Sequence, residues 1–427
     1  MIRSETPMTV HGDPGRWTLT TPDVELGRPV VADGRVHLLV DRRLTVLDAV
    51  TGEPRFQGPH RIAGSESNHS PALRVLGDRI VLPEKTWYVP GAKPAAFTVL
   101  NAADGSLVRE LALEATDGCH LASGVLVSRL HRGEHESLVT AYDLADGRRL
   151  WSRSDHSVHS AEVVAGRLVT TGRDGAGSSV RARDLRTGEP LWCVYRTAEL
   201  DWASGKLIRP ATGAEPEDDP VVFLWSRPRN TLTWLNPRTG EPLGSLTAPR
   251  GSSYPWFDAH LLDGGRTLVT SATYYRRPLR VLHPFEPELP VRTLRFFPHR
   301  VALYGNALVT ADRWLYLTTK DGDLFSTALD EPGPLRRCRR IPRRRRPWFR
   351  SWRSLDLTAG PRHAYASLTT GPLDRLLALR AGQVLWSREG RSLHRPVPLG
   401  DGVLLREQSS TQSLLRLVDG ETGAQAG

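Results

Sequence analysis

The chain has 427 residues, more than the roughly 100 to 200 residues of one ordinary domain, so it contains several domains or an array of repeats. It has 38 glycines and 32 prolines and few long stretches with apolar residues at helical spacing, which favours many short strands joined by turns. The formal net charge is +10, but residues 336–353 hold ten arginines and no acid, so the rest of the chain is electrically balanced. The composition therefore excludes a mainly helical protein and a uniformly basic surface.

The N-terminal residues, MIRSETPMTV, lack the apolar run of about 7 to 15 residues that characterises a secretory signal. No stretch of about 18 uncharged apolar residues appears further along, so no transmembrane segment is predicted. The three cysteines, Cys119, Cys193 and Cys338, are far apart in the sequence and lack metal-ligand spacing. We expect a cytoplasmic protein with reduced cysteines.

One short phrase recurs along the chain, and its copies align on a glycine. In chain order the copies are DAVTGEPRF at Gly52, NAADGSLVR at Gly105, DLADGRRLW at Gly147, DLRTGEPLW at Gly188, NPRTGEPLG at Gly240, ALRAGQVLW at Gly382 and DGETGAQAG at Gly423. Asp or Asn precedes the glycine by four residues in every copy except the one with Ala378. An Asx side chain there can accept the amide hydrogen two residues on, and glycine adopts the positive φ that closes a short hairpin. Each copy therefore predicts a turn between two antiparallel strands.

A large aromatic residue recurs four residues after the glycine. The residues at this place are Phe56, Trp151, Trp192 and Trp386. Arg109 and Gly244 occupy it in two other copies and do not fit the pattern. One aromatic side chain at a fixed place in each hairpin suits packing between neighbouring sheets.

A small turn and an apolar strand precede most copies, as in ADGRVHLLV at 32–40 and GDGVLLRE at 400–407, so each unit contains four short strands. The glycines are spaced by 53, 42, 41, 52, 142 and 41 residues, and the longest gap contains two degenerate copies, at 283–297 and 328–337. A period of about 40 to 50 residues with four strands per unit indicates a β-propeller. The sequence predicts an all-β fold, a single propeller domain over residues 1–427 with eight four-stranded antiparallel blades, within a range of seven to nine.

The segment GRWTLTTPD at 15–23 resembles the strand that follows a turn, with Trp17 in the aromatic place. The chain stops close to its last turn glycine, Gly423, so the last blade lacks its outermost strand. We expect the N-terminal strand to pair into the last blade, which removes an exposed edge and closes the ring.

The phrase D-x-x-T-G-E-P-L-W and the strand pattern before it resemble the repeat of the quinoprotein-like (PQQ-like) β-propeller superfamily. This superfamily includes quinoprotein alcohol dehydrogenases and outer-membrane assembly lipoproteins, and many members bind no quinone and serve as interaction platforms. Its dehydrogenases use a disulfide between adjacent cysteines over the quinone, with calcium ligated by acidic and amide side chains. No two cysteines are adjacent in this chain, so we expect a member that binds no PQQ and no other cofactor.

Residues 131–135, HRGEH, match the H-x-x-E-H pattern of inverted zinc peptidases, in which a helix brings both histidines to one zinc. Gly133 lies in the middle of the motif, and the flanking sequences LVSRL and SLVTAYDL have the character of strands. The segment is therefore predicted to be a hairpin tip, and the match is attributed to chance.

Histidines recur where the innermost strands of the predicted blades begin, and three aspartates lie near the same positions. These candidates for an axial pocket are His69, His120, His159, His260, His299, His394, Asp117, Asp201 and Asp258. If they converge on one axis, they could bind a divalent metal, an anion or a polar ligand. The alternative is that loops tolerate histidine and no ligand is involved.

The segment RRCRRIPRRRRPWFRSWR at 336–353 is the most unusual in composition. We interpret it as an inter-blade loop that binds an acidic partner, with a protein favoured over nucleic acid or an anionic membrane surface. Alternatively its arginines pair with acids of the same molecule or another copy, such as the acidic loop GAEPEDDP at 213–220. The binding candidates are Arg336, Arg337, Arg339, Arg340, Arg343, Arg344, Arg345, Arg346, Trp348, Arg350, Trp352 and Arg353.

Three functions follow from these observations. A non-enzymatic protein-interaction scaffold is favoured, because the residues show no convincing catalytic set. The alternative is a metal-assisted lyase or hydrolase that uses the axial histidines. A quinoprotein dehydrogenase ranks last, because adjacent cysteines are absent.

Overall fold

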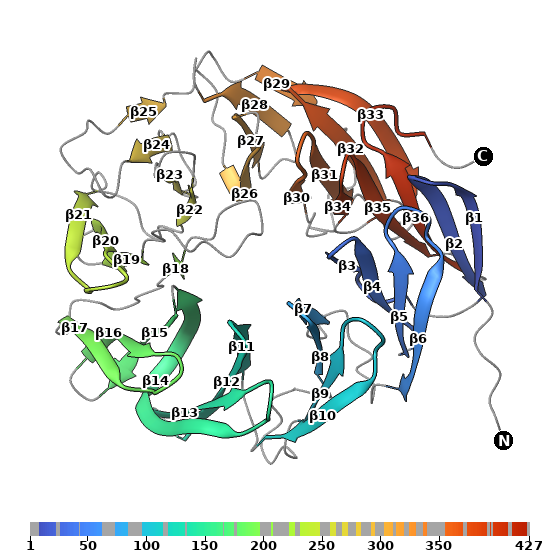
Figure 1. Cartoon of the computed structure of the whole chain (residues 1–427). Coiled ribbons are helices and arrows are strands. Elements are labelled where there is room, and N and C mark those ends of the chain that lie inside the picture. The colour runs from blue at the N-terminus through green and yellow to red at the C-terminus, as the bar shows by residue number, and fades with distance from the viewer. Residues whose placement is uncertain are drawn as a thin grey trace, which may run out of the picture. The chain divides into compact units, whose positions relative to one another are not determined.

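The computed structural model describes most of the strands and many of the turns between them (Figure 1). The described residues are 8–22, 26–41, 43–61, 73–83, 96–113, 118–132, 135–164, 166–174, 177–196, 206–207, 222–226, 231–247, 257–261, 267–271, 279–282, 292–294, 303–310, 313–319, 324–329, 336–339, 355–369, 374–390, 393, 396–408 and 412–424. The named elements in this part of the chain are all β-strands, which confirms the all-β class. Within it, no helix meets the length and apolarity needed to cross a membrane.

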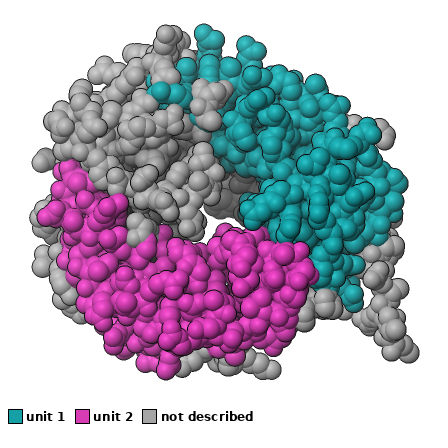
Figure 2. All heavy atoms as spheres, viewed as in Figure 1, with its two compact units in different colours: residues 1–61, 270–279, 293–427 teal, residues 62–269, 280–292 magenta. Residues whose placement is uncertain are grey.

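The chain divides into two compact units, which Figure 2 colours separately. Unit 1 consists of residues 1–61, 270–279 and 293–427, and unit 2 consists of residues 62–269 and 280–292. In both units, the sheets are antiparallel, and neighbouring strands follow each other in the chain except at one pair in the final sheet. A row of four strands paired in this way is called a meander here. The prediction of a single domain over residues 1–427 stays a prediction.

Unit 2 contains a four-stranded sheet, a seven-stranded sheet and a second four-stranded sheet. The first consists of β7 (Arg74–Leu76), β8 (Arg79–Pro83), β9 (Ala96–Asn101) and β10 (Leu107–Ala112). The second consists of β11 (Gly118–Ala122), β12 (Val125–His131), β13 (Glu136–Asp143), β14 (Arg149–Val164), β15 (Arg167–Asp174), β16 (Gly177–Asp184) and β17 (Pro190–Arg196). The third consists of β18 (Lys206–Leu207), β19 (Val222–Ser226), β20 (Thr231–Leu235) and β21 (Pro242–Thr247).

The next four-stranded sheet along the chain consists of β22 (Phe257–Leu261), β23 (Thr267–Ser271), β24 (Leu279–Leu282) and β25 (Arg292–Leu294). Two more four-stranded sheets follow in unit 1, before the sheet that ends the chain. They consist of β26 (Leu303–Val309), β27 (Trp314–Thr319), β28 (Leu324–Ala328) and β29 (Arg336–Arg339), and of β30 (Leu355–Ala359), β31 (Ala364–Thr369), β32 (Asp374–Arg380) and β33 (Gln383–Gly390).

Unit 1 also contains both ends of the described chain. The meander β3 (Val30–Ala32), β4 (Arg35–Val40), β5 (Arg43–Asp48) and β6 (Pro54–Arg61) lies near its start. The final sheet has the order β1-β2-β36-β35-β34. Its strands are β1 (Thr9–Asp13), β2 (Arg16–Pro22), β34 (Val397–Leu399), β35 (Gly402–Gln408) and β36 (Gln412–Asp419).

The long strand β14 belongs to two meanders, because its first half pairs with β13 and its second half pairs with β15. The seven-stranded sheet therefore contains two meanders, and the described residues form nine in all. Nine is the upper end of the expected range and one more than the eight that were predicted. The degenerate copies fall between β24 and β25 and between β28 and β29, so each joins the last two strands of a meander.

The N-terminal strand completes the last meander, as expected. β2 pairs with β36 from Thr18↔Arg416 to Pro22↔Gln412, and Trp17 and Leu19 are buried in a core shared with β4 and β35. One strand was not predicted: β1 pairs with the outer edge of β2 and makes a fifth strand.

The repeated turns have the predicted chemistry. In all six copies with Asp or Asn, that side chain accepts the amide hydrogen two residues on, at 2.8 to 3.1 Å. The seven turn glycines have φ between 63° and 76°. The copy with Ala378 forms a different turn, because β32 and β33 are joined by only Ala381 and Gly382, both with positive φ. Two successive residues with positive φ are typical of a type I′ hairpin, which needs no Asx residue at that place.

Four tryptophans connect neighbouring meanders. The indole rings of Trp17, Trp151, Trp192 and Trp386 would lie 2.4 to 2.9 Å from a Cβ placed on Gly52, Gly188, Gly240 and Gly423, respectively. Each indole Nε1 also donates a hydrogen bond to a backbone carbonyl of that same turn, at 2.8 to 3.2 Å. The turn glycine thus closes its own hairpin and accepts the aromatic ring of the adjacent meander, which confirms the expected packing for these tryptophans. Phe56, the remaining aromatic residue of the pattern, lies against Gly58 of its own strand.

Two turn glycines are covered differently. The Arg109 side chain and Leu111 lie against Gly147, so the aliphatic part of an arginine takes the place of the indole. Gly382 is covered by Trp314 from β27, and its amide donates a hydrogen bond to Tyr316 Oη at 3.0 Å. The first of these contacts accounts for Arg109 in the aromatic place of the repeat.

A buried histidine makes the stability of unit 1 depend on pH. His37 in β4 is 1% exposed, and burial together with the charge of Arg35 lowers its pKa to about 4. An unfolded histidine titrates near pH 6.5, so the unfolded chain binds more protons than the folded chain between pH 6.5 and 4. The contribution of neutral His37 is therefore complete at neutral pH and declines as the pH falls through this window, by up to about 3 kcal/mol.

We expect His37→Gln to flatten the pH dependence of the urea unfolding midpoint between pH 6.5 and 4. His11→Gln, which changes an exposed histidine of β1, serves as the control and should leave the slope as it is. Equal slopes for the two variants would show that His37 does not set this dependence.

Candidate functional site

The nine axial-pocket candidates are only partly described. His120 is half-buried on β11, the first strand of its meander. The backbones of His159, His260 and Asp258 also lie on first strands, His159 at a bulge of β14 and the other two on β22. Outside the described residues are His69, His299, His394, Asp117 and Asp201. Their convergence on one pocket stays a prediction, and the described part of the chain contains no group of three or more His, Cys, Asp or Glu placed to hold a metal.

The HRGEH segment lies at a hairpin, as predicted. β12 ends at His131 and β13 begins at Glu136, and the amide of Arg132 donates to the carbonyl oxygen of Glu136 at 3.0 Å. His131 Nδ1 lies 3.0 Å from Ser137 Oγ, a side chain that is fully buried. This strand geometry differs from the helix that the zinc-peptidase motif requires.

The arginine-rich segment does not begin as a loop, which corrects the predicted boundary of 336–353. Arg336–Arg339 forms β29, the fourth strand of its meander, and pairs with β28 from Ser326↔Arg336 to Leu324↔Arg339. An outer strand tolerates arginine because the long side chain reaches solvent while the backbone stays paired. The other binding candidates, Arg340, Arg343, Arg344, Arg345, Arg346, Trp348, Arg350, Trp352 and Arg353, lie outside the described residues, as does the acidic segment 213–220.

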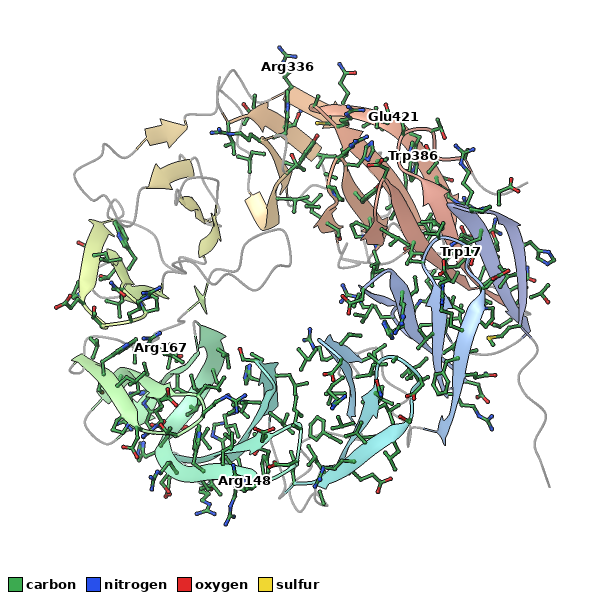
Figure 3. The ribbon with its side chains drawn as sticks, viewed as in Figure 1. Trp17, Arg148, Arg167, Arg336, Trp386 and Glu421 are labelled. Carbon is green, nitrogen blue, oxygen red and sulfur yellow. The ribbon has the colours of Figure 1, made fainter. Side chains whose placement is uncertain are left out.

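β29 is fixed on its buried side and charged on its exposed side. Cys338 Sγ lies 2.9 Å from Ser326 Oγ and 3.2 Å from the carbonyl oxygen of Gly382, and burial raises the pKa of this thiol. The Arg337 guanidinium lies over the Phe325 ring at 5.5 Å, a cation–π contact. Arg336 and Arg337 are exposed, and Arg336 extends away from the sheet (Figure 3).

A buried polar cluster in unit 2 has no counterpart in the sequence predictions. Asp155 lies in the middle of β14, and its side chain is 0% exposed. Its carboxylate accepts hydrogen bonds from Arg181 Nη1 at 2.7 Å and from Arg183 Nε at 3.2 Å, both on β16. Burial alone would raise the pKa of Asp155. The charges of His156 and Arg183, with hydrogen bonds from the His156 amide and the Arg181 side chain, hold this pKa below its ordinary value.

His156 extends this cluster on the next position of β14. Its Nδ1 lies 2.5 Å from Ser179 Oγ, and its Nε2 lies 4.0 Å from the Asp155 carboxylate. Serine, histidine and aspartate in this order resemble a hydrolase triad. The His156 and Asp155 side chains are fully buried, Ser179 is buried, and Asp155 is held by two arginines, so no substrate can reach the serine. The cluster instead ties the two meanders that share β14.

Comparison with known proteins identifies the family of this chain. A family model described as outer membrane protein assembly factor BamB matches residues 12–194 and 98–256, which together cover more than half of the chain. The chain belongs to this PQQ-like β-propeller family. The meanders described above are therefore blades of the family's repeat, and the family resemblance of the repeated phrase is confirmed. None of the curated proteins compared with the chain matches it.

Solved structures are similar to the chain at low sequence identity, and the first one below shares its fold. One titled as the eukaryotic initiation factor has a TM-score of 0.56 and 10% identity, and the match covers 90% of this chain and 96% of that one. BamB from Moraxella catarrhalis has a TM-score of 0.48 and 13% identity, with 81% and 95% covered. A europium-containing methanol dehydrogenase has a TM-score of 0.47 and 11% identity, with 96% and 85% covered.

Proposed function

We propose that this PQQ-like propeller is a non-enzymatic interaction scaffold that binds an acidic protein through the arginine-rich segment 336–353. The observation that carries the proposal is the start of this segment, where Arg336 and Arg337 are exposed on an outer strand that is paired with β28. Arginine binds carboxylates through charge-assisted and often bidentate hydrogen bonds. The family's description as an assembly factor also supports a role in binding other proteins.

A protein partner is favoured over nucleic acid by the charge of the rest of the chain. Without the ten arginines of the segment, the 57 basic residues fall to 47, equal to the 47 acidic residues. Binding to nucleic acid relies on many cationic side chains spread along the path of the phosphate backbone, whereas one short basic segment fits a local group of carboxylates. The scaffold requires no cofactor.

The proposal is tested by titrating the full chain with labelled polyglutamate, with duplex DNA and with anionic lipid vesicles. We expect polyglutamate to bind most tightly, and Arg336→Glu with Arg337→Glu to weaken this binding at least tenfold. Arg148→Glu with Arg149→Glu, which reverses the exposed first arginine of β14 and the exposed arginine just before it, is the matched control and should have little effect. Tighter binding of DNA or vesicles, or an equal loss in both double variants, would overturn the proposal.

A further inference from the structure

The outer edge of one blade already carries an added strand. β1 pairs with β2 over five residues, from Thr9↔Thr20 to Asp13↔Arg16, and four of its five residues are exposed. β2 holds the fourth place in its blade, so β1 is a fifth strand outside the usual four. A strand with so little side-chain burial is held chiefly by main-chain hydrogen bonds, which is the basis of strand addition to a sheet edge. The edge of a blade in this protein therefore accepts a further strand.

β29 occupies the corresponding fourth place of its own blade. Among the described strands, none lies beyond it in the sheet. Its position is fixed by the contacts of Cys338 with Ser326 and Gly382 and by the contact of Arg337 with Phe325. An edge that is already ordered loses little conformational entropy when a partner binds.

β29 has a higher share of arginine than any other described outer strand, with three arginines in four residues. β6 has two arginines in eight residues, one of them paired with Asp48, β17 has one in seven, β10 carries Arg109 beside Glu110, and β21 has no charged residue. β33 has one arginine and one glutamate, which form ion pairs with Glu407 and Arg375. Charged edges discourage pairing with a second copy of the same edge, and opposite charges across a strand pair stabilise the pair.

We infer that β29 is a docking edge to which an extended acidic segment of the partner protein adds as a fifth strand, as β1 does on β2. This inference rests on the proposed function and specifies how the partner binds. Main-chain hydrogen bonds supply the part of the affinity that does not depend on the partner's sequence, and the arginines select a partner strand that carries carboxylates.

The test uses three labelled peptides and the full chain. The first alternates glutamate with threonine, the second has the same sequence with every backbone amide N-methylated, and the third replaces each glutamate with glutamine. We expect the first peptide to bind at least tenfold more tightly than either of the others. Its binding should also slow amide hydrogen exchange in residues 336–339, and the Arg336→Glu, Arg337→Glu double variant should lose it.

The outcomes separate the two proposals. Equal binding of the N-methylated peptide would overturn strand addition and leave the acidic partner in place. Equal binding of the glutamine peptide would overturn the selection of carboxylates by the arginines. If neither the acidic peptide nor polyglutamate binds, the proposed function fails together with the inference.

Discussion

Replacing Gly188 with alanine should lower the free energy of unfolding of the sheet β11–β17 by about 3 kcal/mol, seen as a lower urea midpoint. Two costs add at this position. A non-glycine residue is strained at a φ of 72°, and its Cβ would lie 2.6 Å from Trp151 Cδ2. The ring cannot simply withdraw, because Trp151 Nε1 donates a hydrogen bond to the Leu185 carbonyl oxygen in the same turn.

Gly166→Ala isolates the backbone part of this effect. Gly166 has nearly the same φ, 71°, in another turn of the same sheet, but no atom lies within 4 Å of the added Cβ. We expect this variant to lose only about 1 kcal/mol. If both glycine variants lose the same stability, the contact between Trp151 and the turn does not contribute to holding the blades together.

Asp155→Asn should cost about 3 kcal/mol, because it removes a buried charge and keeps the shape of the side chain. Arg181 and Arg183 are mostly buried and would lose the carboxylate that compensates their charge. The amides of β14 and β16 near this position should then exchange hydrogen faster, because local opening becomes easier.

Glu189→Gln provides the comparison with an exposed ion pair. Glu189 lies 3.8 Å from Arg153, and both side chains are more than half exposed. Such pairs contribute little, so we expect a change below about 0.5 kcal/mol. Similar losses in both variants, or an unchanged midpoint for Asp155→Asn, would show that the buried cluster does not tie the two blades that share β14.

The repeated turns could be predicted residue by residue, because their chemistry lies within one short phrase. The Asx side chain, the glycine and the aromatic residue are close in sequence, and seven copies reveal their spacing. Packing of each tryptophan against a neighbouring sheet also followed from the repeat, but its partner, the turn glycine of the adjacent meander, did not. The indole hydrogen bond to a turn carbonyl did not follow, because backbone acceptors leave no signal in the sequence.

The buried cluster and β29 show what the sequence could not reveal. Asp155 contacts arginines 26 and 28 residues away, and the arrangement occurs in one pair of blades, so no periodicity marks it. The sequence predicts a loop over the whole arginine-rich segment, whereas residues 336–339 form β29. On an outer strand only the backbone must pair, so the usual alternation of apolar and polar residues is not required.

The pairing of β2 with β36 has a consequence for how the protein folds. The two strands are separated by almost the whole described chain, so this blade forms only after β36 has been synthesised. Until then β2 lacks its partner strand, although Trp17 can already contact the turn at Gly52, and pairing between such distant segments forms slowly. We therefore expect the blade that holds both strands to be the last to acquire its native structure during synthesis, whatever the order in which the other blades fold.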